Sequence, residues 1–273
     1  QKVRYLSYGM RQRVAIASAE AIDPEIYVMD EPSANLDIAS TYRFADIIRD
    51  LKQQGKTIII AEHRLYYLMD LADRFLCVQK GKIVREFTAQ QMKVLSNQEI
   101  RALGLRTPDL HQIEQAEIPS AATSEVVLEV KKLNHSFGET IVAKDIDFQC
   151  RKGEVVALIG PNGTGKSTIG RILAGLLKEK SGEVVLFGKY CRPKDRLGKV
   201  WYIPQDLDSQ LFGEDLLDEL TTGAEVSPER KKAAEEILEA LELMPFVKQH
   251  PSTLSGGQKQ RLALGVALMH EAP

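Results

Sequence analysis

Short apolar runs alternate with amphipathic segments along the first hundred residues. Residues 26–29 and 57–61 are continuous apolar runs of strand length. Residues 11–22 and 38–51 place apolar side chains at helical spacing, and a further short helix is predicted at 65–73. Continuous apolar strands of this kind indicate a parallel sheet that is covered on both faces. The pattern further predicts a hairpin at 75–87 and a weakly amphipathic helix at 88–104.

The same kind of pattern resumes after a stretch without periodicity. Residues 105–125 contain prolines and serines among few apolar positions, which predicts a linker. Strands are then expected at 126–130, 141–150, 154–159, 183–187 and 200–203, and helices at 169–177, from 228 onward and up to 270. The chain therefore divides into residues 1–104, a linker at 105–125 and residues 126–273.

The run GPNGTGKST at residues 160–168 matches the phosphate-loop pattern G-x-x-x-x-G-K-[ST]. Its glycines let backbone N–H groups point at phosphate oxygens, and the predicted helix that follows adds partial positive charge. We expect Lys166 to reach the β- and γ-phosphates and the Ser167 hydroxyl to ligate Mg²⁺. A chance match has a probability of roughly one in a hundred for a chain of this length. The expected nucleotide-binding residues here are Gly160, Pro161, Asn162, Gly163, Thr164, Gly165, Lys166, Ser167 and Thr168.

Composition narrows the class of protein. The net charge of −2 over 273 residues indicates neither a nucleic-acid surface nor a polybasic membrane patch. Cys77, Cys150 and Cys191 lack C-x-x-C spacing, which favours reduced thiols over a disulfide frame or a zinc site. No apolar run approaches the ~18 residues of a membrane span, so work at a membrane would require another subunit. Because the chain begins at Gln1 and stops just after a helical pattern, we expect a fragment of a longer protein.

Two predicted strands end in side chains that can act on a phosphate. Residues 26–29 lead into Asp30 and Glu31. Asp30 would hold Mg²⁺ through water, and Glu31 would orient or deprotonate an attacking water; a strand that ends in solvated acids is the alternative. Residues 57–61 lead to His63, at the edge of a parallel sheet where ligands bind, so His63 could contact a γ-phosphate. A purely structural histidine is the alternative.

Two further residues and one stripe have more than one interpretation. Phe137 precedes the phosphate loop by about one supersecondary unit, so it could stack on an adenine ring or be partly buried core. Gln205 follows a predicted strand and could contact Mg²⁺ or water, or be an ordinary loop residue. The apolar stripe within residues 206–223 could be core or a docking surface.

One sequence element occurs twice. LSYGMRQR at residues 6–13 and LSGGQKQR at residues 254–261 share their pattern, and each precedes a helix rich in alanine, valine and leucine. The chain therefore contains an internal repeat that is cut unevenly.

With this repeat, the chain resembles ATP-binding cassette (ABC) ATPases over nearly everything except the linker. The resemblance implies an α/β P-loop NTPase fold, with a parallel-sheet core, antiparallel β and helical subdomains, and elements in permuted order. It implies that Glu31 is the catalytic glutamate, His63 the switch histidine and Asp37 the D-loop aspartate. Residues 6–10 and 254–258 match the signature motif. The resemblance further implies nucleotide contacts from Ser7, Gly9, Phe137, Gln205, Ser255, Gly256, Gly257 and Gln258, and Mg²⁺ contacts from Asp30, Ser167 and Gln205.

The order of these motifs differs from that of a single cassette. A cassette runs from Walker A through Q-loop, signature and Walker B to the switch histidine, whereas this chain starts at a signature and has its Walker A after the histidine. That order is expected for the middle of a longer protein with two fused cassettes. A second hypothesis is that the strand at 26–29 pairs beside the strand at 155–159 in the same chain, which would give a permuted cassette with a spare signature helix.

Family cassettes pair head to tail, so each ATP lies between one Walker A and the opposite signature. The site with Glu31 and His63 would be completed by residues 254–258. The site with Lys166 would be completed by residues 6–10, where Tyr8 and Met10 replace the usual glycine and glutamine. A bulky Tyr8 where the backbone must approach phosphate predicts a weaker site and asymmetric hydrolysis.

Within the family, PQDLDSQLF at residues 204–212 and DLLDEL at 215–220 resemble the ATPase components of energy-coupling factor (ECF) importers. This implies an ATPase that uses ATP and Mg²⁺ on the cytoplasmic side of the membrane to drive uptake of a vitamin or metal ion. Its implied partners are a transmembrane coupling subunit and a substrate-binding membrane subunit. The alternatives are another ABC importer or an exporter, or a ribosome-associated ABC protein. The last is disfavoured because the linker carries Asp109, Glu114, Glu117 and Glu125 against Arg106, which does not suit nucleic acid.

Overall fold

The computed structural model describes residues 8–34, 36–106, 108, 123–208, 210–223 and 227–270, with side chains described from residue 14 onward. Two compact units divide the chain, Gln1–Ile118 and Pro119–Pro273. The division falls within the predicted linker, most of which lies outside the described residues. Each unit is described by itself.

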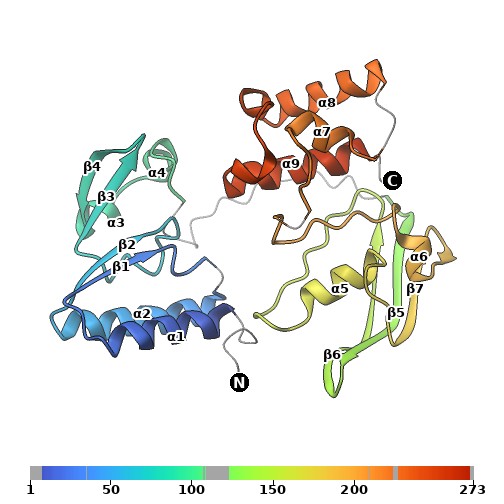
Figure 1. The fold of residues 1–273 in the computed structure, drawn as a ribbon. Coiled ribbons are helices and arrows are strands. Elements are labelled where there is room, and N and C mark those ends of the chain that lie inside the picture. The colour runs from blue at the N-terminus through green and yellow to red at the C-terminus, as the bar shows by residue number, and fades with distance from the viewer. Residues whose placement is uncertain are drawn as a thin grey trace. The chain divides into compact units, whose positions relative to one another are not determined.

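The first unit is built on a two-stranded parallel sheet that lies on a pair of helices (Figure 1). β1 (Ile26–Asp30) pairs in parallel with β2 (Thr57–Ala61), from Ile26 opposite Thr57 to Asp30 opposite Ala61. The helices α1 (Tyr8–Glu20) and α2 (Ile38–Gln53) lie side by side against one face of this sheet. Phe44 and Ile48 of α2 pack there with Met29 and Ile58 of the strands. Burial of these side chains is what holds the sheet to the helices.

The other face of β1 and β2 is exposed. Val28 and Ile59 are paired in register, and they are 74% and 55% exposed. Successive side chains of a strand point to opposite faces, so an apolar run presents an apolar surface on both sides of the sheet. The described residues of this unit cover one face, so coverage of the second face stays a prediction.

The predicted hairpin is confirmed as β3 (Arg74–Gln79) and β4 (Lys82–Thr88), which pair in antiparallel fashion. The single helix predicted at 88–104 is instead two short ones, α3 (Ala89–Lys93) and α4 (Asn97–Ala102), because Thr88 and Ser96 each start a helix with a capping box. The helix predicted at 65–73 is also wrong, since residues 66–71 form turns. In these turns the N–H groups of Leu68 and Leu71 donate hydrogen bonds to the carbonyl oxygens of Leu65 and Leu68.

The second unit contains a four-stranded antiparallel sheet in the order β6-β5-β7-β8. Its strands are β5 (Val126–Phe137), β6 (Thr140–Arg151), β7 (Ser181–Leu186) and β8 (Lys189–Tyr190). Against it packs α5 (Lys166–Leu173), through Ile172, and the short α6 (Pro193–Arg196) contacts α5. β5 is longer than predicted and ends at Phe137, which pairs with Thr140 and so lies in the strand instead of the loop that follows it.

Two strands predicted for this unit are not formed in its described residues. Residues 154–160 and 201–204 have no strand assignment, and Val155 and Ile159 are exposed. The pairing of residues 26–29 with 155–159 would join the two units, so it stays a prediction; within the first unit β1 pairs with β2. Apolar sequence favours a strand, but the strand exists only where a neighbour satisfies its N–H and C=O groups.

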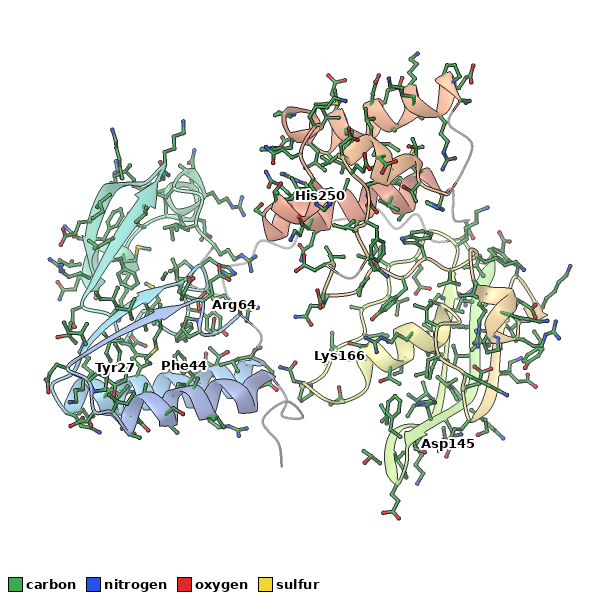
Figure 2. All side chains as sticks on the ribbon, in the orientation of Figure 1. Tyr27, Phe44, Arg64, Asp145, Lys166 and His250 are labelled. Atoms are coloured by element: carbon green, nitrogen blue, oxygen red, sulfur yellow. The ribbon has the colours of Figure 1, made fainter. Side chains whose placement is uncertain are left out.

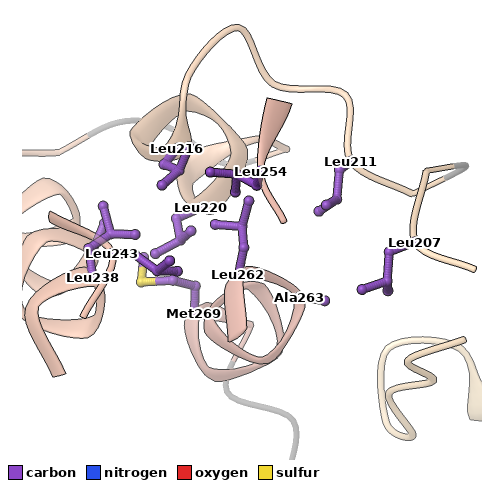
Figure 3. Close-up of a cluster of buried hydrophobic side chains, with 11 residues drawn as sticks. Leu207, Leu211, Leu216, Leu220, Leu238, Leu243, Leu254, Leu262, Ala263 and Met269 are labelled. Carbon is purple, nitrogen blue, oxygen red and sulfur yellow. The ribbon is translucent and has the colours of Figure 1, made fainter. Parts of the chain in front are cut away.

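Three helices of the second unit enclose a separate core. They are α7 (Leu216–Thr221), α8 (Pro228–Ala240) and α9 (Gly256–Met269). The 3-10 turns η3 (Met244–Phe246) and η4 (Pro251–Thr253) lie between α8 and α9. Figure 3 shows their leucines converging, among them Leu220, Leu238 and Leu262, which are fully buried. The stripe in residues 206–223 is thus largely core, although Phe212 is exposed. Among the helices that the structure describes, none is long and apolar enough to cross a membrane.

Candidate nucleotide-binding site

The loop at residues 160–165 turns sharply into α5. Gly160, Gly163 and Gly165 have φ values of 150°, 83° and 93°, in a region that other residues rarely adopt. A Cβ on Gly165 would also lie 2.7 Å from the side chain and the carbonyl oxygen of Val142, so β6 backs the loop closely. Among the described residues, no side chain caps α5 at Gly165. The N-terminus of α5 is therefore open to an anion.

Lys166 curls back over this loop, at the start of α5 (Figure 2). Its Nζ donates hydrogen bonds to the carbonyl oxygens of Gly160 and Pro161, both at 2.7 Å. Thr164 Oγ1 donates to the same Pro161 carbonyl at 2.9 Å. Both hydrogen-bond partners of the ammonium are neutral, so no carboxylate compensates its charge in these contacts. The ammonium is therefore available to form an ion pair with a phosphate.

The other loop residues lie at the surface. Ser167 is exposed on the first turn of α5, Thr168 is half-buried beside it, and Asn162 is exposed at the tip of the loop. Gln205 is likewise exposed, after the irregular segment 201–204.

Phe137 lies at the end of β5 and is 55% exposed. Its ring packs edge to face against His135, with the centroids 4.8 Å apart and an interplanar angle of 79°. His135 is buried, and no described group forms a hydrogen bond with either of its ring nitrogens. Sequence analysis missed His135, which its two-residue spacing from Phe137 in a strand could have indicated. The histidine supports one side of the phenyl ring and leaves the rest available for stacking.

The second signature-like element, at residues 254–258, starts α9. Ser255 and Gln258 form a capping box, in which Ser255 Oγ accepts from the Gln258 N–H and Gln258 Oε1 accepts from the Ser255 N–H at 2.8 Å. A Cβ added to Gly256 or Gly257 would meet no described atom within 4 Å. Neither of these two glycines has a positive φ. Neither backbone conformation nor packing against the residues that the structure describes therefore requires glycine here.

The first signature-like element is only partly described. Ser7 lies outside the described residues, and Gly9 belongs to the first turn of α1, where only the backbone is described. The Tyr8 side chain is also outside the description, so its effect on the site stays a prediction.

The structure brings Glu31 and His63 together at the carboxyl ends of β1 and β2. Asp30 closes β1 opposite Ala61 and is exposed. Glu31 follows with φ of 42°, while its N–H still donates to the Ala61 carbonyl at 2.9 Å. Its Oε1 lies 3.6 Å from Nδ1 of His63, and both side chains are accessible, 57% and 39% exposed. The parallel register explains this proximity, because it aligns the two strand ends.

Glu62 is a member of this group that sequence analysis missed. Its side chain is only 1% exposed. Oε1 accepts hydrogen bonds from the N–H groups of His63 at 2.8 Å and Arg64 at 3.0 Å. Oε2 accepts from the N–H and the hydroxyl of Ser33, at 3.3 and 2.5 Å, and from the Tyr67 hydroxyl at 3.0 Å. An acid directly after an apolar strand and beside the histidine was the available signal.

These contacts keep Glu62 ionised. Burial by itself raises the pKa of the carboxyl, but the hydrogen bonds from Ser33, from the Arg64 and His63 amides and from Tyr67 lower the pKa by more. The pKa of Glu62 is therefore below its ordinary value. The pKa of Tyr67 is raised, first by burial and then by the negative charge of Glu62.

Arg64, labelled in Figure 2, holds the segment that follows Glu31. Its guanidinium donates to the carbonyl oxygens of Ser33 at 3.0 Å, Ala34 at 3.0 Å and Leu36 at 3.4 Å. Asp37 comes next and caps α2 by accepting the Ser40 N–H at 2.8 Å. The predicted D-loop aspartate thus fixes the start of a helix in this structure.

The predicted metal ligands are distributed over both units. Asp30 belongs to the first unit, and Ser167 and Gln205 belong to the second, so their joint site stays a prediction. All three are exposed and carry oxygen donors, which suits Mg²⁺. No group of three or more His, Cys, Asp or Glu side chains within the described ranges could hold a metal ion.

Comparisons with known proteins agree with this set of motifs. A family model described as ABC transporter matches residues 1–34 and 143–273. An ABC transporter ATP-binding protein of Treponema denticola is 38% identical over 273 residues, which is 98% of this chain and 56% of that protein. YkoD of Bacillus subtilis, named as an HMP/thiamine import ATP-binding protein, is 31% identical over 294 residues, which is 97% of this chain and 54% of YkoD. The chain spans about half the length of these curated relatives.

Among solved structures, cbiO1 from Clostridium perfringens, described as part of the ABC transporter complex cbiONQ, is 26% identical. The match covers 54% of this chain and 62% of that one, with a TM-score of 0.48. The family model alone covers more than half of the residues, on both sides of the linker. The predicted fold class, a P-loop cassette with parallel and antiparallel sheets, is confirmed. This chain belongs to the ABC transporter family of ATP-binding proteins.

Proposed function

We propose that this chain binds and hydrolyses ATP as part of the ATPase of an ECF-type ABC importer for a vitamin or a metal ion. The observation that carries the proposal is the phosphate loop. Three glycines with positive φ, an N-terminus of α5 that no described side chain caps, and an ammonium whose hydrogen bonds to described residues go to neutral carbonyls form a site for phosphate groups. The import of a micronutrient is supported by the name of YkoD and by residues 204–212.

In this proposal each residue has a distinct task. The adenine stacks on the exposed ring of Phe137, and the phosphates lie against the N–H groups of residues 160–168. Lys166 exchanges its two carbonyl partners for phosphate oxygens. Ser167 and Gln205 would hold Mg²⁺ at the Lys166 site, where it would neutralise charge on the β- and γ-phosphates, and Asp30 would hold the Mg²⁺ of the site with Glu31 and His63.

Hydrolysis is assigned to the exposed pair at the ends of β1 and β2. Glu31 orients or deprotonates the attacking water, and His63 contacts the γ-phosphate. Both side chains are accessible and 3.6 Å apart, so a single bound water or phosphate oxygen can touch both.

The N-terminus of α9 is assigned to a nucleotide bound by another cassette. Gly256 and Gly257 have open space over their Cα atoms, which permits a phosphate to approach the backbone. The corresponding element at residues 6–10 carries Tyr8, so we propose unequal hydrolysis at the two composite sites. Partners are a second cassette, a transmembrane coupling subunit and a substrate-binding membrane subunit, with the ATPase at the cytoplasmic face.

Replacement of Lys166 tests nucleotide binding. In the full-length protein, K166A should weaken binding of a fluorescent ATP analogue by about tenfold or more, because the cation that faces the phosphates is lost. The matched control is K178A, an exposed lysine after α5. Equal affinity of both variants would overturn the proposal. Co-purification of membrane subunits and ATP-dependent solute uptake by the reconstituted complex test the transport part.

A further inference from the structure

We propose that Glu62 and Arg64 are positioning residues that set the geometry between Glu31 and His63 by fastening residues 33–36 to the end of β2. This inference rests on the proposed hydrolysis at Glu31 and His63. It assigns a role to the two residues that flank the histidine, neither of which carries a predicted contact with nucleotide.

Glu62 joins two segments that are far apart in the sequence. One carboxylate oxygen takes the backbone N–H groups of His63 and Arg64, and the other takes both donors of Ser33, which is fully buried. The same carboxyl group therefore fixes the backbone on which His63 stands and the backbone two residues beyond Glu31. An ionised carboxylate is required for this, because both oxygens act only as acceptors.

Arg64 completes the attachment from the other side. Its planar guanidinium reaches the carbonyl oxygens of Ser33, Ala34 and Leu36, a set that runs along one turn of chain. A fork of fixed donors suits several carbonyls at once, whereas a lysine ammonium is a single point. Ser33 thus has its N–H and hydroxyl bound by Glu62 and its carbonyl bound by Arg64.

The backbone of Glu31 explains why such an attachment matters. Glu31 has φ of 42°, a conformation that a non-glycine residue keeps only when its surroundings enforce it. On one side the enforcement comes from its N–H, which pairs with Ala61. On the other side it comes from Ser33, through Glu62 and Arg64. Release of Ser33 would let Glu31 relax and change its distance to His63, now 3.6 Å.

Loss of a positioning residue should change kcat and KM differently from a general loss of folding. Glu62 and Arg64 carry no proposed contact with ATP, so KM should stay constant while turnover falls. In the full-length protein we expect E62Q to lower kcat about tenfold or more, since misplaced catalytic groups are ineffective. KM for ATP should remain within about twofold of wild type. R64K should lower kcat less, because it keeps the charge and loses the fork.

Two variants with the same chemical change serve as controls. E99Q alters a carboxylate that caps α4, and R74K alters an exposed ion pair with Glu86. Both lie in the same unit, and both should keep wild-type kcat. If E62Q does not fold, as judged by its thermal unfolding, S33A decides instead, because it removes only the hydroxyl donor at 2.5 Å and should lower kcat with KM unchanged.

The outcomes separate this inference from the proposed function. A wild-type protein without ATP hydrolysis, or with hydrolysis that E31Q does not reduce, overturns the proposed assignment of Glu31. Hydrolysis that depends on Glu31 but is the same in E62Q, R64K and S33A as in the controls overturns the positioning role alone. A loss of kcat accompanied by an equal rise in KM also overturns it.

Discussion

The phosphate loop and the strand-end group of Glu31, Glu62 and His63 are held in opposite ways. The loop keeps its shape through glycine backbones, and within the described part of the chain its charged group, Lys166, donates hydrogen bonds to two carbonyls of its own loop. The strand-end group is built around Glu62, a buried carboxylate with donors from Ser33, His63, Arg64 and Tyr67. We therefore expect the loop to exchange hydrogen-bond partners when an anion binds, and the strand-end group to keep its partners.

Magnitudes support this contrast. A hydrogen bond between neutral groups contributes about 0.5–1.5 kcal/mol net, and one to a charged group contributes about 1.5–3 kcal/mol. The Lys166 bonds are charged but partly exposed, so solvent replaces them at little cost. The Glu62 bonds are buried, and removal of the carboxylate would strand several donors. Changes in the loop should therefore act on binding, and changes at Glu62 should act on stability and turnover.

The largest expected effect tests the exposed part of the strand-end group. E31Q should lower ATP hydrolysis at its site by about a hundredfold or more, the usual contribution of a general base. Because the Glu31 side chain is more than half exposed, the midpoint of thermal unfolding of E31Q should match that of wild type. Phosphate release measured on the full-length protein and thermal unfolding check both parts. E86Q, which alters an exposed acid of β4, is the control, and equal loss of activity in both variants would contradict the assignment.

The next effect concerns the loop. G165A should weaken ATP binding by about tenfold and destabilise the second unit by about 1–3 kcal/mol, since alanine is strained at φ of 93° and its Cβ would lie 2.7 Å from Val142. G163A separates the two causes, because it has the same sign of φ with no described atom within 4 Å of the added Cβ. Calorimetry of nucleotide binding and unfolding should show a smaller change for G163A. Equal changes would show that the contact with Val142 is unimportant.

The buried carboxylate predicts a stability effect that depends on pH. The pKa of Glu62 is lower in the folded state than in the unfolded chain, where it is about 4.3. Its charged form therefore stabilises the fold fully above that value, and this stabilisation is lost as the pH falls through the folded pKa. E62Q should be less stable than wild type by about 1–3 kcal/mol at pH 7. The difference should shrink below about pH 4.

Denaturant unfolding at several pH values measures this difference. The control is E99Q, which removes a carboxylate that caps α4 from an exposed position. The pKa of Glu99 is lowered as well, by hydrogen bonds from Ser96, but its exposure should make the effect smaller. A pH-independent difference between wild type and E62Q would show that the charge of Glu62 is not what stabilises the fold.

The same two regions show what sequence can and cannot predict. The phosphate loop was found because its function depends on residues at fixed local spacing, and Glu31 and His63 were placed at one edge because parallel strands align their carboxyl ends. Glu62 was missed because its key partner, Ser33, is 29 residues away. That contact is a property of tertiary packing, which local patterns do not encode.

The errors in secondary structure have similar causes. Residues 154–159 have the composition of a strand, yet a strand needs a neighbour, and none of the described strands pairs with them. In contrast, the break between α3 and α4 was present in the sequence as two capping boxes, starting at Thr88 and Ser96. These caps predict the break between the two helices better than the weak apolar period of residues 88–104 does.

The smallest expected effect on stability comes from a glycine that neither region needs for its own fold. G257A should stabilise α9 slightly, by less than about 1 kcal/mol, because alanine favours a helix and the added Cβ meets no described atom within 4 Å. If Gly257 is open so that a phosphate on another cassette can approach, the same variant should lower ATP hydrolysis while ATP binding at Lys166 is unchanged. Unfolding and phosphate release on one preparation test both statements. The matched control is A267G, near the end of the same helix, which should destabilise α9 without altering hydrolysis. Wild-type hydrolysis in G257A would mean that the open N-terminus of α9 receives no ligand.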